Sequence, residues 1–304
     1  MTDTGIAYFN GNFIPESRAT VPILSHSFGR GSAIFEVLSF HEIPGGRALF
    51  RLDEHIHRFF RSAELLEMTV PLTKKEIAHA VRQTVQKNSL AAGFIKIIGY
   101  YPQISYEVLP PQESLDVAIF AFNGSVNPSK AGTPAPGGFS ACLSRWRKLD
   151  PETVPVEAKV AANYLNGMVA RREALKRGFD YVIMLDTEGG IAEGATESVF
   201  FVKDGVLLTP SLGPVLASIT RLSLLQAATV EGIETREEPL SSGILTDADE
   251  IFLGGTLYRV RPIGKIEGRV IEGTPGPLTR HLANLMDRIT AGQDDRFADW
   301  LFPL

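Results

Sequence analysis

Two stretches carry the most information: Pro155-Val156-Glu157-Ala158-Lys159-Val160-Ala161-Ala162-Asn163-Tyr164-Leu165 and, further along the chain, Ile191-Ala192-Glu193-Gly194-Ala195-Thr196-Glu197-Ser198-Val199-Phe200. Lys159 supplies an amine that can form a Schiff base. Its small, apolar neighbours would favour the neutral, nucleophilic amine. Tyr164 adds a phenol five residues later, and Glu193 adds a carboxylate on a following strand. The rest of the sequence indicates in which kind of protein these three groups occur together.

Length and composition describe an ordinary globular protein. The chain has 304 residues, 44% of them hydrophobic and 21% charged, and a formal net charge of −5. This balance gives no reason to expect a nucleic acid or a membrane as partner. Cys142 is the single cysteine, so no intrachain disulfide forms. No N-terminal secretory signal is visible, and no apolar run approaches the roughly 20 residues needed to cross a bilayer. We expect a cytoplasmic protein.

The first part of the chain predicts a mixture of strands and helices. An Asn-Gly turn at Asn10-Gly11 favours a hairpin over residues 7–14. Apolar positions recur at helical spacing between Asp53 and Met68. A capping box at Thr73 starts a second helix. Further strands are expected at residues 33–40, 94–101 and 116–122.

The second part predicts repeated hairpins with a few helices. Strands are expected at residues 181–185, 199–202 and 206–208, a further hairpin at residues 265–270, and helices at residues 160–177, 219–230 and 278–291. This order predicts an α+β architecture rather than a doubly wound sheet. Gly, Pro and Ser crowd residues 123–138. We therefore expect a small N-terminal domain at 1–122, an interdomain loop at 123–138, and a large C-terminal domain at 139–304 that carries Lys159.

An amine, a phenol and a carboxylate are the groups that hold and tune pyridoxal 5′-phosphate (PLP). Together with their flanking residues, the two stretches resemble the class IV (fold type IV) PLP-dependent aminotransferases, the family of branched-chain and D-amino acid aminotransferases. The resemblance runs from about Tyr8 to about Pro262. It implies PLP as cofactor and a homodimer or larger assembly. It also implies a small α/β sandwich-like N-terminal domain and a larger domain with a hairpin-rich pseudo-barrel and helices.

The resemblance assigns the cofactor-binding residues. Lys159 would form the Schiff base and carry the transferred proton, Tyr164 would bond the phenolic oxygen of PLP, and Glu193 would keep the pyridine nitrogen protonated. Arg58 would reach the phosphate, with Arg61 as a nearby competitor.

Two further segments match those that bind the cofactor phosphate in this family. Ser218, Ile219 and Thr220 begin a helix whose N-terminus suits an anion, although the family usually has glycine at the position of Ser218. Thr256 follows Gly254-Gly255 in a second turn that would bind the phosphate.

The residues at the expected substrate-binding positions differ more from those of the branched-chain enzymes than the cofactor-binding residues do. Arg30 stands where they usually have tyrosine, Val37 and Ser39 replace glycine and arginine, and Phe94 and Lys96 replace tyrosine and arginine. The Phe-Glu-Val sequence is closer to the D-amino acid enzymes. The resulting substrate residues are expected to be Arg30, Phe35, Phe94, Lys96, Thr256 and Leu257. Phe35 would line the apolar side, while Arg30 and Lys96 would meet a second carboxylate.

We therefore predict a transaminase that moves an amino group from a branched-chain or aliphatic L-amino acid to 2-oxoglutarate by a ping-pong mechanism. The alternatives are a D-amino acid or (R)-amine transaminase, an aminodeoxychorismate-type lyase, and a non-catalytic binding protein in which Lys159 is inert. No metal is expected, because His55 and His57 are two residues apart on a helix and face different directions.

Overall fold

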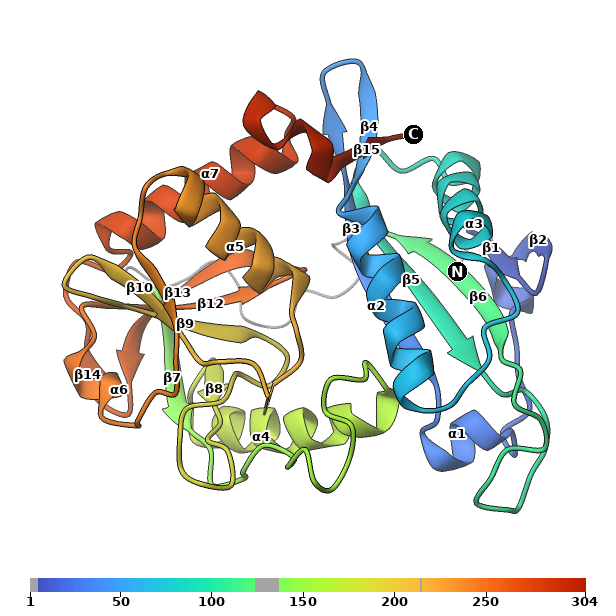
Figure 1. Ribbon diagram of the computed structural model, residues 1–304, viewed down its shortest axis with the longest axis horizontal. Helices are drawn as coiled ribbons and strands as arrows, with labels where there is room; N and C mark the ends of the chain where they lie inside the picture. Colours follow the sequence, from blue (N-terminus) through green and yellow to red (C-terminus); the bar gives the residue numbers. More distant parts are fainter. Residues whose placement is uncertain (1–4, 124–136, 214) are drawn as a thin grey trace. The chain divides into compact units, whose positions relative to one another are not determined.

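The computed structural model describes residues 5–123, 137–213 and 215–304, which form two compact units (Figure 1). The first unit consists of Met1–Asn127, Ala158–Ala162 and Ile289–Leu304. The second unit consists of Pro128–Glu157 and Asn163–Arg288. Residues 124–136 of the predicted interdomain loop lie outside the described residues. No helix among the described residues is long and apolar enough to cross a membrane.

One seven-stranded antiparallel sheet organises the first unit. Its strands, in spatial order, are β15 (Leu301–Pro303), β4 (Gly46–Phe50), β3 (Ile34–Ile43), β5 (Gly93–Tyr100), β6 (Asp116–Phe122), β1 (Ile6–Phe9) and β2 (Asn12–Pro15). The short helix α1 (His26–Arg30) precedes β3. The predicted hairpin and the three predicted strands of this region are therefore present, with small shifts at their ends.

Two amphipathic helices, α2 (Leu52–Leu65) and α3 (Lys74–Lys87), pack on one face of this sheet (Figure 1). The apolar positions of α2 that recur at helical spacing are buried against the strands. Helix α3 begins at the predicted capping box, in which Glu76 N–H donates to Thr73 Oγ1 and Thr73 N–H donates to the Glu76 carboxylate. Helices α2 and α3 therefore cover one face of the first sheet.

Side chains of β3 alternate between the two faces of the sheet. Ile34, Glu36 and Leu38 are fully buried, whereas Phe35 and Val37 are only half-buried. A charged residue, Glu36, therefore occupies a position of the strand that alternation assigns to the hydrophobic core.

A second sheet, of eight strands, organises the second unit. Its main path is β11 (Thr235–Glu237), β10 (Val206–Thr209), β9 (Ser198–Lys203), β12 (Glu250–Gly255), β13 (Arg259–Ile266), β7 (Phe139–Leu143) and β8 (Tyr181–Ile183), with β14 (Arg269–Val270) beside β13. The helices are α4 (Tyr164–Lys176), α5 (Ile219–Val230), α6 (Ile244–Asp247) and α7 (Pro277–Thr290), the last of which continues into the first unit. Mixed helices and sheets confirm the α+β prediction.

The expected pseudo-barrel does not close among the described strands. The path ends at β11 on one side and β8 on the other, with no described pairing between them. The pairs β10–β11, β13–β7 and β7–β8 are parallel, and the remaining pairs are antiparallel. Parallel neighbours need long crossovers, which local hairpin signals in a sequence do not reveal.

The segment that carries Lys159 differs most from expectation. The sequence predicts a helix over residues 160–177, but Ala161–Asn163 form a 3₁₀ turn and α4 begins only at Tyr164. Val160 instead pairs with Ile34, and Ala161 N–H donates to Ala33 O at 2.8 Å. The Lys159 carbonyl, which would accept the first hydrogen bond of a helix beginning at residue 160, instead accepts from Phe35 N–H at 2.9 Å. The domain prediction placed Lys159 with residues 139–304, whereas Ala158–Ala162 make their contacts within the first unit.

A buried ionic cluster lies between β3 and α2. Arg58 Nε and Nη2 donate to the two carboxylate oxygens of Glu36 at 2.7 and 2.8 Å, and His55 Nδ1 lies 2.8 Å from Glu36 Oε2. Burial alone would raise the pKa of Glu36, but the charge and hydrogen bonds of Arg58, with the hydrogen bond of His55, lower it to about 2. Glu36 is therefore ionised in the core of the folded protein.

The stability of the fold should depend on this ionisation. The pKa of Glu36 is lowered from 4.5 to about 2, so its stabilising effect is present above pH 4.5 and is lost as the pH falls toward 2. We predict that Glu36→Gln lowers the free energy of unfolding at neutral pH by about 3–5 kcal/mol, because it leaves Arg58 without its counter-charge. Urea unfolding at several pH values tests this. The difference between wild type and variant should narrow below pH 4.5, and a constant difference would contradict the assignment.

Candidate active site

The backbone of Lys159 is fixed on both sides within the first unit. Its N–H donates to Ser62 Oγ on α2 at 2.9 Å, and its carbonyl accepts from Phe35 N–H on β3 at 2.9 Å. Its side chain is half-buried, and Nζ lies 4.9 Å from the centre of the Phe35 ring. Lys159 is thus held against an apolar strand, in contrast to a solvated surface lysine.

Phe35 belongs to a half-buried face that also carries Lys96 and Phe94. In the β3–β5 register Val37 lies opposite Lys96 and Ser39 opposite Phe94, so these residues share the face of Phe35. Lys96 Nζ lies 5.1 Å from the same ring, and burial lowers its pKa. The Phe94 ring stacks on Phe122 at 5.8 Å between centroids. The structure therefore brings together Lys159, Phe35 and Lys96, with Phe94 further along the same face.

The two candidate arginines of α2 differ in their environment. Arg58 is directed inward to Glu36, and only 11% of its side chain is exposed. Arg61 is about half exposed and pairs with Glu64 at 2.9 Å on the helix surface. Because both carboxylate bonds of Arg58 come from Nε and Nη2, its guanidinium plane is fixed. Arg58 is thus the buried and oriented arginine of the two, and its contact with a phosphate stays a prediction.

Arg30 has a role that the sequence did not indicate. Its Nη2 donates to Tyr106 O at 2.9 Å and its Nε to Glu107 O at 3.3 Å. A ring nitrogen of His26, Nε2, lies 2.8 Å from Val108 O. In the described chain, Arg30 therefore fastens the loop that follows β5 to helix α1, whereas its predicted contact with a substrate carboxylate stays a prediction.

In the second unit, Tyr164 is half-buried at the first residue of α4. Three residues further, Gly167 packs directly on the loop after Glu193, because a Cβ there would lie 2.2 Å from Ala195 O. Only glycine allows this approach of helix and loop. The helix that Tyr164 begins is therefore locked against the segment that carries Glu193.

Glu193 is buried, in contrast to the exposed hairpin glutamate that its neighbour Gly194 alone would suggest. Its carbonyl accepts from Met184 N–H at 2.9 Å, which extends the pairing beyond β8. Its carboxylate forms an ion pair with Lys148, whose own N–H donates to Leu185 O. Lys148 holds the carboxylate in one orientation, and a fixed carboxylate can accept a hydrogen bond from a protonated ring nitrogen.

The predicted phosphate segment forms the N-terminus of α5. Ser218 is the N-cap, and its Oγ accepts from Arg221 N–H at 3.3 Å. Its φ of −72° and ψ of 129° are ordinary extended values, so serine fits where the family usually has glycine. Helix geometry leaves the first N–H groups without a partner inside the helix, which suits an anion. Thr220 is buried beside them.

The Thr256 turn lies beside α5 and the Glu193 loop. Gly254, at the end of β12, pairs with Ser198 at the start of β9. A Cβ on Gly254 would lie 3.0 Å from Leu224 Cδ1 of α5, so helix and strand pack closely here. Thr256 is half-buried in the turn that follows, and Leu257 is exposed. The strand that leads into the Thr256 turn is thus packed on helix α5.

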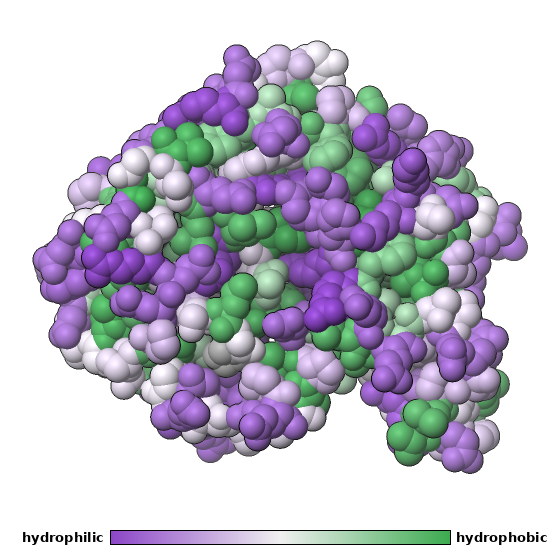
Figure 2. Space-filling view, in the orientation of Figure 1, coloured by the Kyte–Doolittle hydropathy of each residue, from purple (hydrophilic) through white to green (hydrophobic). Residues whose placement is uncertain are grey.

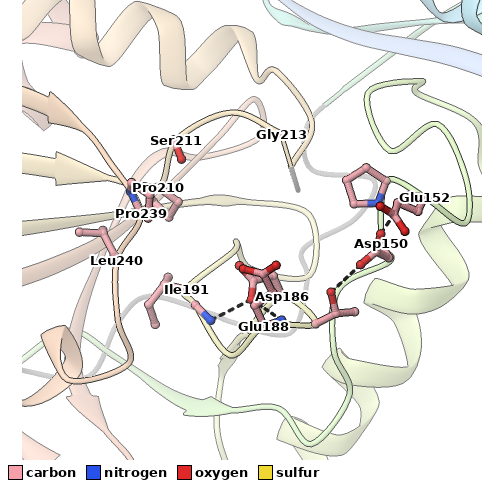
Figure 3. A pocket seen from close by; sticks show the side chains of 13 residues that line it. Asp150, Glu152, Asp186, Glu188, Ile191, Pro210, Ser211, Gly213, Pro239 and Leu240 are labelled. Carbon is pink, nitrogen blue, oxygen red and sulfur yellow. Dashed lines mark hydrogen bonds between the residues drawn. The ribbon is translucent and has the colours of Figure 1, made fainter.

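A pocket of about 530 Å³ in the second unit is lined by acidic residues (Figure 3). Four carboxylates line it, those of Asp150, Glu152, Asp186 and Glu188. Asp186 accepts from Glu188 N–H at 3.0 Å and Gly190 N–H at 2.8 Å, so it braces the turn that leads toward Glu193 (Figure 3). Like-charge repulsion makes this pocket unsuitable for a phosphate.

Three residues with clear structural links to the predicted site were missed from the sequence: Glu36, Ser62 and Lys148. For Glu36 a signal existed, since a charge between Ile34 and Leu38 breaks the apolar alternation of a core strand. Ser62 and Lys148 gave no such signal, because their partners are distant in sequence.

The donor set fits pyridoxal phosphate. The first unit supplies an amine held against an aromatic ring and an arginine with a fixed plane. The second unit supplies a buried carboxylate, a helix N-terminus and a hydroxyl-bearing turn. Amine, carboxylate and phosphate donors are the groups that this cofactor requires.

Comparison with known proteins identifies the family. The sequence profile of the family "Amino-transferase class IV" matches residues 33–266. The branched-chain-amino-acid aminotransferase of Escherichia coli (strain K12) is 34% identical over 298 residues, which cover 97% of this chain and 96% of that protein.

Two solved structures show the same fold. The branched-chain aminotransferase of Thermoproteus uzoniensis with norvaline has a TM-score of 0.92 at 32% identity and covers 98% of this chain and 99% of that chain. The branched-chain amino acid aminotransferase of Thermobaculum terrenum in its PLP form has a TM-score of 0.91 at 29% identity and covers 100% of this chain and 99% of that chain. The resemblance seen in the sequence is thereby confirmed: the chain belongs to the class IV aminotransferases and has their fold type IV.

Proposed function

We propose that this aminotransferase, a pyridoxal-phosphate enzyme, moves the amino group of a branched-chain or aliphatic L-amino acid to 2-oxoglutarate in ping-pong order. The observation that carries the substrate proposal is the half-buried face of the first sheet. There the side-chain nitrogens of Lys159 and Lys96 lie 4.9 and 5.1 Å from the centre of one phenylalanine ring, that of Phe35. The names of the relatives and of the solved structures support the same reaction class.

This face offers both surfaces that the two substrates need. Phe35, Val37 and Phe94 present apolar surface, which suits a branched aliphatic side chain. Lys96 adds a cation whose pKa is lowered by burial, so a carboxylate beside it would restore favourable charge pairing. One pocket could thereby accept leucine in one half-reaction and 2-oxoglutarate in the other.

The bound cofactor supplies an aldehyde carbon for amines and an electron-accepting ring. Lys159 is the proposed catalytic residue: its amine holds the cofactor and, once displaced by a substrate amine, moves a proton from the substrate Cα. Its backbone bonds to Ser62 and Phe35 keep the amine in place for this transfer.

The remaining groups are proposed to bind and orient the cofactor. Glu193, held by Lys148, would favour the protonated ring nitrogen, and Tyr164 would donate to the phenolic oxygen. Arg58, the N-terminus of α5 (Ser218, Ile219 and Thr220) and Thr256 would bind the phosphate. Backbone N–H groups of Thr256 and Leu257 are the proposed donors to the substrate α-carboxylate.

We further propose that the protein forms a homodimer through the surface around α1 and the loop after β5. Tyr106, Val108 and Leu109 are 76–77% exposed, and Phe28 on α1 is 66% exposed. Figure 2 shows a small group of hydrophobic residues among hydrophilic ones at the lower right, where Figure 1 places α1. Arg30 and His26 hold the loop in shape, so the apolar groups form a fixed surface, as a second copy would require. The cytoplasmic location stays a prediction.

The first test is spectroscopic. Purified protein incubated with PLP should show a visible absorbance band that borohydride bleaches, and L-leucine should collapse the band. Lys159→Ala should lose the band and reduce transamination by at least about 10²-fold, because the amine and the proton carrier are both removed. Lys75→Ala, at an exposed lysine of α3, is the matched control.

D-Alanine, added separately, tests the stereochemical alternative. Collapse of the band with D-alanine alone would replace the L-amino acid proposal with a D-amino acid or (R)-amine transaminase. Release of pyruvate from aminodeoxychorismate would instead indicate a lyase. No band in wild type would contradict the proposed function.

Lys96→Met tests the proposed carboxylate contact. We expect KM for 2-oxoglutarate to rise roughly ten- to hundredfold, since a charge-assisted hydrogen bond is lost. KM for 4-methyl-2-oxopentanoate, which lacks the second carboxylate, should change much less. Lys87→Met is the control, because this lysine also lies above a phenylalanine ring, that of Phe13 at 4.9 Å. Equal effects on both oxo acids would remove Lys96 from the carboxylate site.

The homodimer proposal predicts that charge on the exposed surface dissociates the assembly. Phe28→Asp combined with Leu109→Asp should shift sedimentation equilibrium from dimer toward monomer, because two carboxylates would be desolvated in each copy of the interface. Leu175→Asp, at another exposed leucine, should leave the mass unchanged. A wild-type protein that sediments as a monomer would contradict the proposal.

A further inference from the structure

A continuous set of hydrogen bonds in the first unit connects a core carboxylate to the proposed phosphate arginine and to Lys159. Glu36 on β3 binds Arg58 Nε and Nη2 at 2.7 and 2.8 Å. Four residues along α2, Ser62 Oγ donates to Arg58 O at 2.9 Å and accepts from Lys159 N–H at 2.9 Å. The arginine and the lysine are therefore attached to the same turn of one helix.

His55 completes the environment of Glu36. Burial lowers the pKa of His55, so its imidazole is neutral. An ionised carboxylate only accepts hydrogen bonds, so the proton at the 2.8 Å contact must be on His55 Nδ1. Glu36 is thus fixed by donors from two residues of α2. A carboxylate fixed in this way also fixes the plane of the guanidinium that it binds.

Stability alone does not explain a carboxylate at this position. Ile34 and Leu38, its neighbours on the same face of β3, are fully buried apolar residues. Buried ion pairs are often no more stabilising than apolar residues of similar size, so apolar side chains in place of both Glu36 and Arg58 would serve the core equally well. A long arginine loses conformational freedom when it binds a ligand, and a partner that orients it beforehand reduces that cost.

We propose that Glu36 is a positioning residue for the cofactor phosphate: it holds the guanidinium of Arg58 in the orientation that binds the phosphate of pyridoxal phosphate. This inference rests on the proposed function of the site. Glu36 itself touches neither cofactor nor substrate. It acts through Arg58, whose guanidinium it binds at Nε and Nη2.

The test compares pyridoxal phosphate with pyridoxal, which lacks the phosphate. Full-length protein freed of cofactor is titrated with each compound, and dissociation constants are read from the absorbance that borohydride bleaches. Glu36→Gln should weaken pyridoxal phosphate on the order of ten- to hundredfold, because the arginine loses its fixed orientation. Pyridoxal, which Lys159, Tyr164 and Glu193 would hold without help from Arg58, should bind with a dissociation constant that changes by less than about twofold.

Two further variants make the result specific. Arg58→Lys keeps the charge but loses the fork, and the double variant should be no weaker than Arg58→Lys, since Glu36 acts through the arginine. Glu250→Gln is the control for loss of a buried carboxylate; Glu250 accepts from Leu278 and Thr279 N–H in the second unit. Glu36→Asp, which shortens the side chain and keeps its charge, replaces Glu36→Gln if that variant does not fold.

The outcomes separate this inference from the proposed function. Equal weakening of pyridoxal phosphate and pyridoxal by Glu36→Gln would mean general disruption near Lys159 and would overturn the positioning role. Unchanged binding of both would overturn it as well, while leaving the aminotransferase intact. If wild type forms no bleachable complex with either compound, the proposed function itself fails.

Discussion

The pairing of Ala158–Ala162 with the beginning of β3 is the constraint on which the site depends. Val160 pairs with Ile34, and the Lys159 carbonyl accepts a backbone hydrogen bond from Phe35, so the lysine is fixed in the register of a core strand. Register also decides which face a side chain occupies. The same strand places Phe35 beside the lysine and Glu36 beneath helix α2. The reactive amine, an apolar surface and a buried charge therefore follow from a single strand.

In the second unit, close packing of the backbone at two glycines holds the predicted site segments. Gly167 lets α4 approach the loop after Glu193, and Gly254 lets β12 approach α5. A Cβ at Gly167 would overlap the backbone of the loop, and a Cβ at Gly254 would crowd the Leu224 side chain, so these elements pack closely. Glu193, α5 and the Thr256 turn are consequently carried by parts of the fold that are packed on one another. Rigid support of this kind is what precise placement of a cofactor requires.

Each unit buries a carboxylate beside a cation. Glu36 and Glu193 are buried, and each has a cationic partner, Arg58 and Lys148 respectively. A buried carboxylate without a partner would become neutral or destabilise the fold. A cationic partner offsets this cost and fixes the orientation of the carboxylate. The two carboxylates thus serve different ends: we infer that Glu36 orients an arginine, and we propose that Glu193 tunes a ring nitrogen.

Much of this protein was determined by the sequence itself. The hairpin at Asn10-Gly11, the capping box at Thr73 and the helix Ile219–Val230 follow from local signals, because turns, caps and helical periodicity depend on neighbouring residues. The identities of Lys159 and Glu193 within their flanking residues were enough to indicate the family, which the comparisons confirm.

Only the tertiary structure decided how these residues are held. The helix expected from residue 160 gives way to a strand-like pairing, in which the Lys159 carbonyl accepts from Phe35 N–H. The parallel neighbours of β7, the pair between Glu36 and Arg58, and the hold of Arg30 on the loop after β5 join residues distant in sequence. Local propensity does not predict such contacts. They stabilise the protein only after the chain has folded and brought the partners together.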